Sequence, residues 1–437
     1  MRNDDAFRLK DGMGRREFLR GSAAALMLAS WEAAVAEGQF SSAVGKPLVA
    51  WRQGHFQVHF VYTGVGETVF LVYPDGTSLL IDCGDHPARK RGKYAVPVLP
   101  DASRHAGEWV ARYVLKTNPR REKVDYMLLT HYHSDHGGGR HYHAGLSANG
   151  RYYLSGFGQA MEYLSFGKAV DRAYPTYDDP LPLSAAADCW TLSHLDGVYR
   201  ELVRRGTKVE KFRLEKGGDQ LRPLYGGAAG FSWRPLSANG RLLGPDGSVR
   251  DLYADFIARA RPGGLNENAM SIGLRYAYGP FSLYTAGDFE DRVPQADGTR
   301  REIEEAMAEI VGPCTVAKVN HHGNSSMCEK LVGALRSQVY VGCVWDWFHV
   351  DDGTMTRLAD RSLYPGDRLL CPGVMAAARR TRDGSRPWMA DVAEATYEGV
   401  HVVFDVPPGG ETFTLSLVSA ADETLTVRSE IEMRTRT

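Results

Sequence analysis

Short apolar stretches bounded by glycine, proline and aspartate follow one another after residue 55 and predict β-strands. β-Branched and aromatic side chains dominate these stretches, and such residues favour strands over helices. The first three expected strands are residues 57–62, 68–73 and 78–81. Residues 124–130 form a fourth stretch without polar alternation, which is typical of a strand buried on both faces. We expect this strand to stop at His131.

Helical spacing appears first at residues 104–117, where Trp109, Val110, Tyr113 and Val114 fall on one face. Further helices are expected at residues 163–170, 195–205 and 301–310, and a proline-rich polar loop at 174–187. Later strands are expected at residues 231–236, 270–278, 281–286, 314–319, 402–404 and 412–417. Strands that alternate with helices predict a layered α/β core rather than an all-β sandwich.

The N-terminus has the order of a signal peptide. Arg15 and Arg16 precede a small, apolar stretch at residues 21–29, and residues 34–36 (Ala-Val-Ala) offer a cleavage site. The arginine pair resembles a twin-arginine export signal. We therefore expect residues 1–36 to be read by the twin-arginine export machinery and removed, which would place the mature protein in the periplasm or outside the cell.

Residues 37–437 are expected to form one domain, with an insertion at about 156–228 and C-terminal strands and helices at about 335–420. This length is ample for one large core. No later stretch reaches the ~18 apolar residues of a membrane-spanning helix. We therefore expect no stable membrane anchor after processing.

Charge and cysteine usage narrow the possible partners. The chain has 437 residues, with 52 Lys and Arg against 53 Asp and Glu, and a formal net charge of −1. No global basic field is therefore available to attract nucleic acid or an anionic membrane. The six cysteines show no CxxC spacing, which argues against a cysteine-built zinc knuckle and favours packing roles.

Side chains of the kinds that bind metals gather where the strand at 124–130 ends, namely His131, His133, Asp135 and His136. In extended backbone His131 and His133 point the same way, so both can bind one cation. Asp135 and His136 follow where the chain turns toward a helix, and they can reach a second cation. Three of the 14 histidines fall within six residues, which is not expected by chance. The stretch therefore predicts a metal site.

The pattern His-x-His-x-Asp-His resembles the signature of the metallo-β-lactamase superfamily. The resemblance continues at Asp82, earlier in the chain, and at Asp288 and His322, later in the chain. It implies an α/β fold, an αββα sandwich with helical or loop insertions. It also implies that Asp82 supports the ligand loop, that Asp288 bridges two metals and that His322 is the last ligand, with His321 as the alternative. The implied metal ligands are His131, His133, Asp135, His136, Asp288 and His322. The implied cofactors are two divalent ions, with zinc as the first choice and manganese as the alternative.

Many members of that superfamily supply a third histidine to the first metal. The candidate here is His194, which is expected to open the helix at 195–205, and a water or another oxygen is the alternative. His141 and His143 are interpreted as outer or exposed residues rather than ligands. His349 is a weak candidate for contacting the substrate, with a packing role as the alternative.

A narrower likeness, over roughly residues 55 to 350, is to the hydrolase domain of ComEC-type competence proteins. The residues that carry it are 58–60, 64–67, 81–82, 268–272 and 321–323. Glu67 departs from that group, in which Asp is usual, and so does Asn324, where Ser is usual. The large membrane channel region of that group is absent.

These features predict an exported, metal-dependent hydrolase. A metal-bound hydroxide would attack the substrate, and Asp135 would orient it and help to move its proton. The ComEC-type resemblance favours hydrolysis of a phosphodiester, in a small molecule or a nucleic acid. Hydrolysis of a small ester, lactone or β-lactam is the alternative, and a metal-bound binding protein without turnover is the second. No serine-nucleophile elbow, P-loop or dinucleotide fingerprint competes with these readings.

Overall fold

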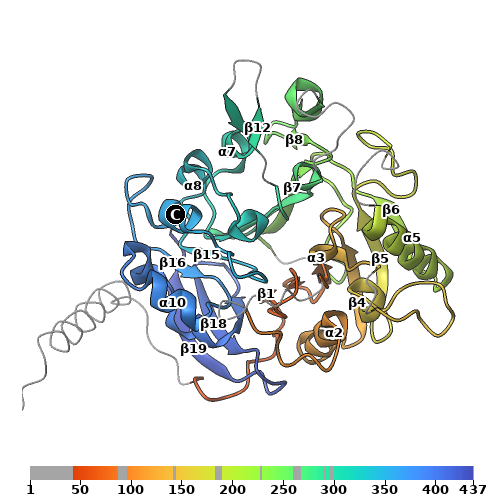
Figure 1. The fold of residues 1–437 in the computed structure, drawn as a ribbon, viewed down its shortest axis with the longest axis horizontal. Coiled ribbons are helices and arrows are strands. Elements are labelled where there is room, and N and C mark those ends of the chain that lie inside the picture. Colours follow the sequence, from red (N-terminus) through yellow and green to blue (C-terminus); the bar gives the residue numbers. More distant parts are fainter. Residues whose placement is uncertain are drawn as a thin grey trace, which may run out of the picture. The chain divides into compact units, whose positions relative to one another are not determined.

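Two mixed β-sheets carry the fold (Figure 1). The first has the strand order β19-β18-β17-β1-β2-β3-β4-β5-β6. Strands β3 to β6 run parallel to one another, and the other neighbouring strands pair antiparallel. The strands are β1 (Phe56–Phe60), β2 (Val69–Val72), β3 (Ser78–Ile81), β4 (Lys123–Leu128), β5 (Ser165–Asp171), β6 (Lys208–Lys211), β17 (Val400–Val406), β18 (Thr412–Ser419) and β19 (Val427–Arg434).

The second sheet has the order β16-β15-β14-β11-β10-β7-β8-β9. Here β11, β14, β15 and β16 are parallel, and the rest pair antiparallel. Its strands are β7 (Phe231–Ala238), β8 (Arg241–Leu243), β9 (Val249–Asp251), β10 (Gly273–Tyr278), β11 (Phe281–Thr285), β14 (Val316–Lys318), β15 (Val339–Val341) and β16 (Leu369–Cys371). A separate small sheet pairs β12 (Arg292–Pro294) with β13 (Arg300–Glu302).

Helices flank the sheets and connect their strands. The α-helices are α2 (Ala106–Thr117), α3 (Ser134–Gly137), α4 (Phe157–Ala160), α5 (Cys189–Arg204), α7 (Glu304–Val311), α8 (Glu329–Leu335), α9 (Asp352–Ala359) and α10 (Ala377–Asp383). The shorter turns are a π-turn at Tyr253–Ile257 and 3₁₀ turns at Asn268–Met270, Asn320–Gly323, Pro387–Asp391 and Glu394–Glu398.

The structure is a computed structural model that describes residues 43–86, 96–140, 144–182, 189–226, 229–258, 267–289, 292–294 and 299–436. These residues belong to the compact unit Phe40–Thr437. The expected signal peptide, residues 1–36, lies outside the described residues. Within the described ranges, no helix has both the length and the hydrophobicity that crossing a membrane requires.

Alternating side chains of the strands build the inner hydrophobic layer. Val69 and Leu71 of β2 point between the two sheets, where they share one buried cluster with Leu283 of β11 and Val316 of β14. These side chains are fully buried. The two sheets therefore pack face to face.

The opposite faces of the sheets are covered by helices. Phe70 of β2 belongs to a cluster with Val110 of α2 and Leu195 of α5. On the second sheet, Tyr284 of β11 packs in a cluster with Met307 of α7, and α8 contributes to the same cluster. The order helix, sheet, sheet, helix is the expected αββα sandwich, and the fold class is confirmed.

One predicted element is wrong. Residues 163–170 were expected to be helical, but Ser165–Asp171 form strand β5. This segment pairs in parallel with β4 on one side and β6 on the other. Hydrogen bonding to these two strands outweighs the local preference of the segment for a helix. Gly167, near the centre of the segment, already weakens that preference. Part of the expected insertion at 156–228 therefore extends the first sheet.

The loops that follow the parallel strands lie at one edge of the sandwich. In the first sheet β3 ends just before Asp82, and its parallel neighbour β4 ends just before the His131 loop. In the second sheet β11 ends just before Asp288, and its parallel neighbour β14 ends just before His322. The carboxyl ends of parallel strands lie at the same edge, and ligand sites form there.

Two buried histidines lie together on the first sheet, His59 on β1 and His401 on the neighbouring strand β17. His59 Nδ1 is 2.9 Å from the Tyr113 hydroxyl, and His401 Nδ1 accepts the backbone N–H of Tyr62 at 3.0 Å. The Tyr113 ring lies between the two imidazoles, with its centroid 5.8 Å from His59 and 4.6 Å from His401. Burial lowers the pKa of each histidine to about 3, and for His59 the neighbouring His401 adds to the effect.

This arrangement predicts a loss of stability in acid. Above pH 6.5 both histidines are neutral in the folded and in the unfolded chain, so they do not change the free energy of unfolding. Between pH 6.5 and about pH 3 they are protonated in the unfolded chain but stay neutral in the folded chain, which destabilises the folded state. When the pH falls from 7 to 5, each histidine should lower the free energy of unfolding by about 2 kcal/mol. His401→Asn keeps an acceptor for Tyr62 and should lose about 2 kcal/mol less than the wild type over this interval. Urea unfolding of both chelator-treated proteins at the two pH values measures this, and equal losses would contradict it.

Candidate metal centre

The stretch from His131 to His136 lies where β4 gives way to α3. His133 stands at the N-terminus of α3 in extended conformation, and α3 itself contains Asp135 and His136. The loop after β3 packs directly on this helix. Its Cys83 N–H donates to the His136 carbonyl at 2.7 Å, and a Cβ on Gly84 would lie 1.9 Å from the Asp135 carbonyl oxygen. Only glycine permits so close an approach.

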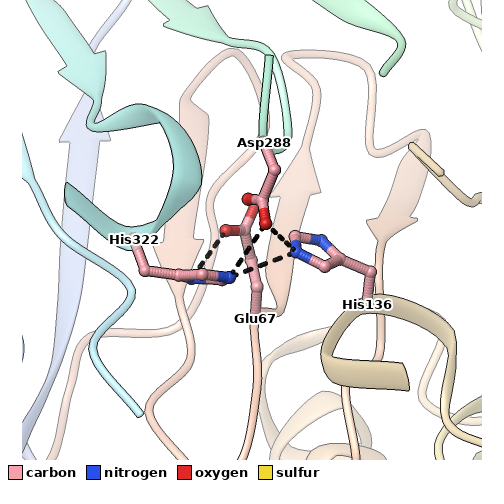
Figure 2. A group of neighbouring side chains, drawn as sticks. All are labelled: Glu67, His136, Asp288 and His322. Carbon is pink, nitrogen blue, oxygen red and sulfur yellow. Dashed lines mark hydrogen bonds and ion pairs between the residues drawn. The ribbon is translucent and has the colours of Figure 1, made fainter. Parts of the chain in front are cut away.

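The first group of donors, which we call the His136–His322 cluster, consists of Asp135, His136, Asp288 and His322. Figure 2 shows the imidazoles of His136 and His322 reaching toward each other from opposite sides, with the Asp288 carboxylate between them. The two Nε2 atoms are 3.2 Å apart, and Asp288 Oδ2 is 3.1 Å from the first and 3.3 Å from the second. Asp135 Oδ2 is 3.0 Å from His322 Nε2 and 3.9 Å from His136 Nε2.

The second group, the His131–His133 cluster, uses the same Asp288 carboxylate. His131 Nε2 faces His133 Nδ1 at 3.1 Å and lies 3.9 Å from Asp288 Oδ2. His131, His133 and Asp288 are close enough to share one metal ion, and so are Glu67, His136, Asp288 and His322. The structure thus brings together all six residues expected to be ligands, and it places Asp288 between the two groups.

Outer hydrogen bonds leave the inward nitrogens of three histidines available as donors to a cation. Asp82 Oδ2 accepts from His136 Nδ1 at 2.7 Å and from the Thr130 hydroxyl at 2.7 Å. Thr130 Oγ1 in turn is 3.1 Å from His131 Nδ1, and the Cys343 carbonyl accepts from His322 Nδ1 at 2.9 Å. Because each Nδ1 carries the proton, each Nε2 presents a lone pair inward. Asp82 therefore has the supporting position that the sequence predicts for it.

A left-handed turn selects His322 over His321. Both residues have positive φ, 48° at His321 and 53° at His322, within the turn Asn320–Gly323. This turn directs His322 to the cluster, whereas His321 Nε2 lies 3.2 Å from the Asn268 side-chain amide. Gly323 then packs against the next loop, since a Cβ there would lie 2.2 Å from Val350 Cγ1.

The carboxylates make the His136–His322 cluster attractive to positive charge. Burial alone would lower the pKa of His322, but Asp288 and Asp135 outweigh it and raise this pKa to about 9. Burial likewise opposes the charge on His136, yet Asp288 and Asp82 hold its pKa well above the usual value. In His131 burial prevails, assisted by His136 and His133, and the pKa lies well below the usual value.

The residues present fit a metal ion. Two donors bound to one zinc ion at a tetrahedral angle lie about 3.3 Å apart. The Nε2 and Oδ2 atoms of His136, Asp288 and His322 are separated by 3.1 to 3.3 Å. In addition, Asp288 Oδ1 is buried and has no hydrogen-bond partner within the described part of the chain. An acceptor in this condition is costly unless a cation faces it.

Glu67 is a charged residue of the centre that the sequence alone did not single out as functional. Its Oε2 atom lies 2.9 Å from Lys318 Nζ and 3.6 Å from His322 Nδ1, on the side of that ring away from Nε2. Both Glu67 and Lys318 are fully buried. Lys318 Nζ also donates to the carbonyls of Gly287 at 2.6 Å and Val319 at 3.1 Å, next to Asp288 and the His322 turn. Glu67 is therefore the charge partner of Lys318, and its carboxylate is also close enough to His136, Asp288 and His322 to share a metal ion with them.

Other sequence candidates lie elsewhere. His194 is buried within α5 beside Tyr153, and neither cluster includes it. His141 and His143 lie outside the described residues. His349 is buried and stacks on His322, with ring centroids 5.1 Å apart, and its Nδ1 accepts the Asp346 N–H at 3.2 Å. His349 thus packs behind a ligand.

Comparison with known families agrees with this geometry. The model of the metallo-β-lactamase superfamily matches residues 62–184, which is less than a third of the chain. The matched segment contains Asp82 and the stretch from His131 to His136, whereas Asp288 and His322 lie beyond it. No curated protein matches the chain.

The pairing of the buried charges of Glu67 and Lys318 can be tested by substitution. Lys318→Met leaves a carboxylate without its cation in the core and should cost about 3–5 kcal/mol. Adding Glu67→Gln removes that charge, so the double variant should recover more than half of the loss. The comparison uses urea unfolding of chelator-treated proteins. If the double variant loses as much stability as Lys318→Met and Glu67→Gln lose together as single variants, the two charges do not depend on each other.

Proposed function

We propose that this protein hydrolyses phosphodiester bonds outside the cytoplasm with two divalent metal ions, zinc as the first choice and manganese as the alternative. The superfamily match and the buried clusters of histidine and carboxylate support a metal-dependent hydrolase. Imidazole and carboxylate together suit zinc well. Substrate class, metal identity and location are the parts that we add.

The observation that carries the proposal is the position of Asp288. One oxygen atom, Oδ2, lies within 3.1 to 3.9 Å of Nε2 atoms from both clusters. The backbone N–H of Asp288 donates to the Ser271 hydroxyl at 3.2 Å, which fixes the position of this residue. A single fixed carboxylate can therefore hold two cations close together, as two-metal hydrolases require.

Two divalent ions held there would lower the pKa of a water molecule and neutralise the charge that develops on the attacked group. The role of the chain's own residues is to orient that water and to receive its proton. Asp135 is suited to this role because it is the carboxylate of the centre nearest to solvent, 8 % exposed against 0 % for Asp82 and 1 % for Asp288. Its Oδ2 is 3.0 Å from His322 Nε2, which places this carboxylate at the rim of the metal-binding cluster.

The phosphodiester choice is supported by the likeness to ComEC-type hydrolase domains, whose His-His-Gly element is present here at residues 321–323. A pair of cations also matches the two non-bridging oxygens of such a substrate, which share one negative charge. A short or small phosphodiester agrees better with the net charge of −1 than a long polyanion does.

A second candidate function, hydrolysis of a small ester, lactone or β-lactam, is favoured by the aromatic residues at the centre. Trp345 lies with its ring centroid 4.8 Å from His86 and 5.8 Å from His322. Trp347 and Phe348 follow, and all three aromatic side chains are partly exposed. These three aromatic side chains can pack against an apolar acyl group.

The proposal predicts release of p-nitrophenol from bis-p-nitrophenyl phosphate by the metal-replete protein without its first 36 residues. Asp135→Asn keeps the size of the side chain but cannot take a proton, so kcat should fall at least about 100-fold. His321→Asn, in the same region but outside both clusters, serves as the matched control and should retain most activity. Turnover of nitrocefin or a lactone without phosphodiester turnover would instead support the second candidate. No turnover of any ester would contradict both.

Export is the remaining part of the proposal, and it concerns residues outside the described ranges. Arg15 and Arg16, the apolar stretch at 21–29 and the site at 34–36 support it. The twin-arginine route carries folded proteins, which suits a chain whose metal ligands come together only in the finished fold. We therefore expect the mature chain to begin after residue 36.

Replacing both arginines tests this route. Arg15→Lys/Arg16→Lys should leave the full-length precursor in the cytoplasm, whereas the wild type should appear as the shorter chain in the periplasmic or external fraction. Fractionation followed by N-terminal sequencing measures both. Normal processing and export of the double variant would rule out the twin-arginine route.

A further inference from the structure

Arg172, which directly follows β5, is a fully buried arginine whose hydrogen bonds fix it in one orientation. Its Nε and one terminal nitrogen donate to the two oxygens of the Glu267 carboxylate at 2.7 and 2.6 Å. The other terminal nitrogen donates to the Asp179 carbonyl and to the Asn239 side-chain oxygen, each at 2.9 Å. Because the guanidinium is planar and bound along two directions, it holds the Glu267 carboxylate in one place.

The Glu267 carboxylate also accepts a hydrogen bond from the backbone of the ligand stretch. Its Oε1 accepts the Tyr132 N–H at 2.8 Å, and Tyr132 stands between His131 and His133. Glu267 itself occupies the N-cap position of the turn Asn268–Met270. The Arg172–Glu267 pair therefore binds the short piece of backbone that joins two expected metal ligands.

The side chain of Tyr132 is held by the same part of the fold. Its hydroxyl donates to the two carboxylate oxygens of Asp171 at 2.7 and 2.8 Å. The guanidinium of Arg172 lies over its ring, 4.6 Å from the centroid. Two consecutive residues at the end of β5, together with Glu267, thus fix Tyr132 through both its backbone and its ring.

Stability alone does not account for a buried pair of charges at this place. Apolar side chains of similar volume often stabilise a fold as well as a buried ion pair does. An apolar pair, however, offers no acceptor to the N–H of the buried residue Tyr132. A buried N–H without an acceptor is unfavourable, so this peptide would turn toward another partner.

The orientation of His133 depends on that peptide in particular. In the described ranges the side chain of His133 makes no hydrogen bond other than the one to His131, at 3.1 Å. It is also partly exposed, so packing does not fully enclose it. The direction of its ring is therefore set mainly by the backbone that precedes it.

From these contacts we infer that Arg172 and Glu267 are positioning residues, which fix the Tyr132 peptide and thereby the direction in which His131 and His133 present their ring nitrogens. The part of this inference that concerns turnover rests on the proposed function. The part that concerns the arrangement of the ligands does not.

Substitution of Glu267 in the protein without residues 1–36, loaded with cobalt(II), tests the inference. The visible absorption of cobalt(II) depends on the number and geometry of its ligands. Glu267→Met has a similar size but offers no acceptor to Tyr132, so it should change this spectrum. It should also lower kcat for bis-p-nitrophenyl phosphate about 10- to 100-fold with little change in KM. Glu267→Gln keeps an acceptor oxygen and should restore most of both.

Arg241→Met is the matched control. Arg241 donates to the Asp179 carboxylate at 2.9 Å, so it belongs to the same charged network, but its bonds reach neither Glu267 nor Tyr132. The cobalt spectrum and kcat of this variant should equal those of the wild type. A spectrum altered as much as in Glu267→Met would contradict the assignment to Glu267.

A double variant separates positioning from stability. Glu267→Met leaves the charge of Arg172 buried without its partner, whereas Arg172→Met/Glu267→Met removes both charges. The double variant should therefore resist urea better than Glu267→Met. Its cobalt spectrum and kcat should nevertheless stay altered, because the Tyr132 N–H still lacks its acceptor. If spectrum and kcat return to wild-type values together with stability, the pair is purely structural and the inference is overturned.

This inference and the proposed function fail in different ways. A wild-type cobalt spectrum and wild-type phosphodiester turnover in Glu267→Met would remove the positioning role and leave the proposed function standing. An altered spectrum, in a protein whose wild type hydrolyses no ester, would keep the positioning role and remove the hydrolase function.

Discussion

Negative charge buried at one edge of the sandwich is the constraint around which the centre is built. Glu67, Asp82, Asp135 and Asp288 all lie there with little or no exposure to solvent. A buried carboxylate is tolerated only with hydrogen bonds or positive charge beside it. Each of the four has such a partner. Lys318 faces Glu67, Thr130 and His136 donate to Asp82, and the two imidazoles of the His136–His322 cluster serve Asp135 and Asp288.

This arrangement links metal binding to the completed fold. The carboxylates raise the pKa of His322 to about 9, so a metal ion must replace a proton on that ring. The replacement is favourable because a divalent ion interacts with the same carboxylates more strongly. Glu67, His136 and His322 come from segments far apart in the chain, and only the packed pair of sheets brings them together. The cage therefore forms when the two sheets pack, and a bound ion stabilises that packing.

Local signals in the sequence predicted the parts of the fold that depend on local pattern. The strands that became β1 to β4 are short, apolar and bounded by turn residues, and the His131–His136 stretch is dense in donors. Asp288 and His322 were found through resemblance to a family, since one Asp and one His carry no local signal. Glu67 was noted only as a departure from that family. A single Glu gives no sign that it is buried, and its partner Lys318 is 251 positions away in the chain.

Errors and omissions have the same origin. Ser165–Asp171 became a strand because β4 and β6 offered partners on both sides, which no local pattern reveals. Strands β15 and β16 have three residues each and escaped prediction because they are too short to show a period. Pairing across the sheet decides such elements.

The loop after β15 connects His322 to a group of partly exposed aromatic side chains, Trp345, Trp347 and Phe348. The Cys343 carbonyl holds His322 Nδ1, and two residues later Trp345 stands beside the His322 ring. The same loop is tied to the His322 turn again, since the Asp351 N–H donates to the Gly323 carbonyl at 2.8 Å. Arg379 of α10 fixes it from behind by donating to the carbonyls of His349 and Val350. Because these bonds connect the loop to His322 and to the turn that contains it, we expect a change in the backbone of the loop to shift His322 within its cluster.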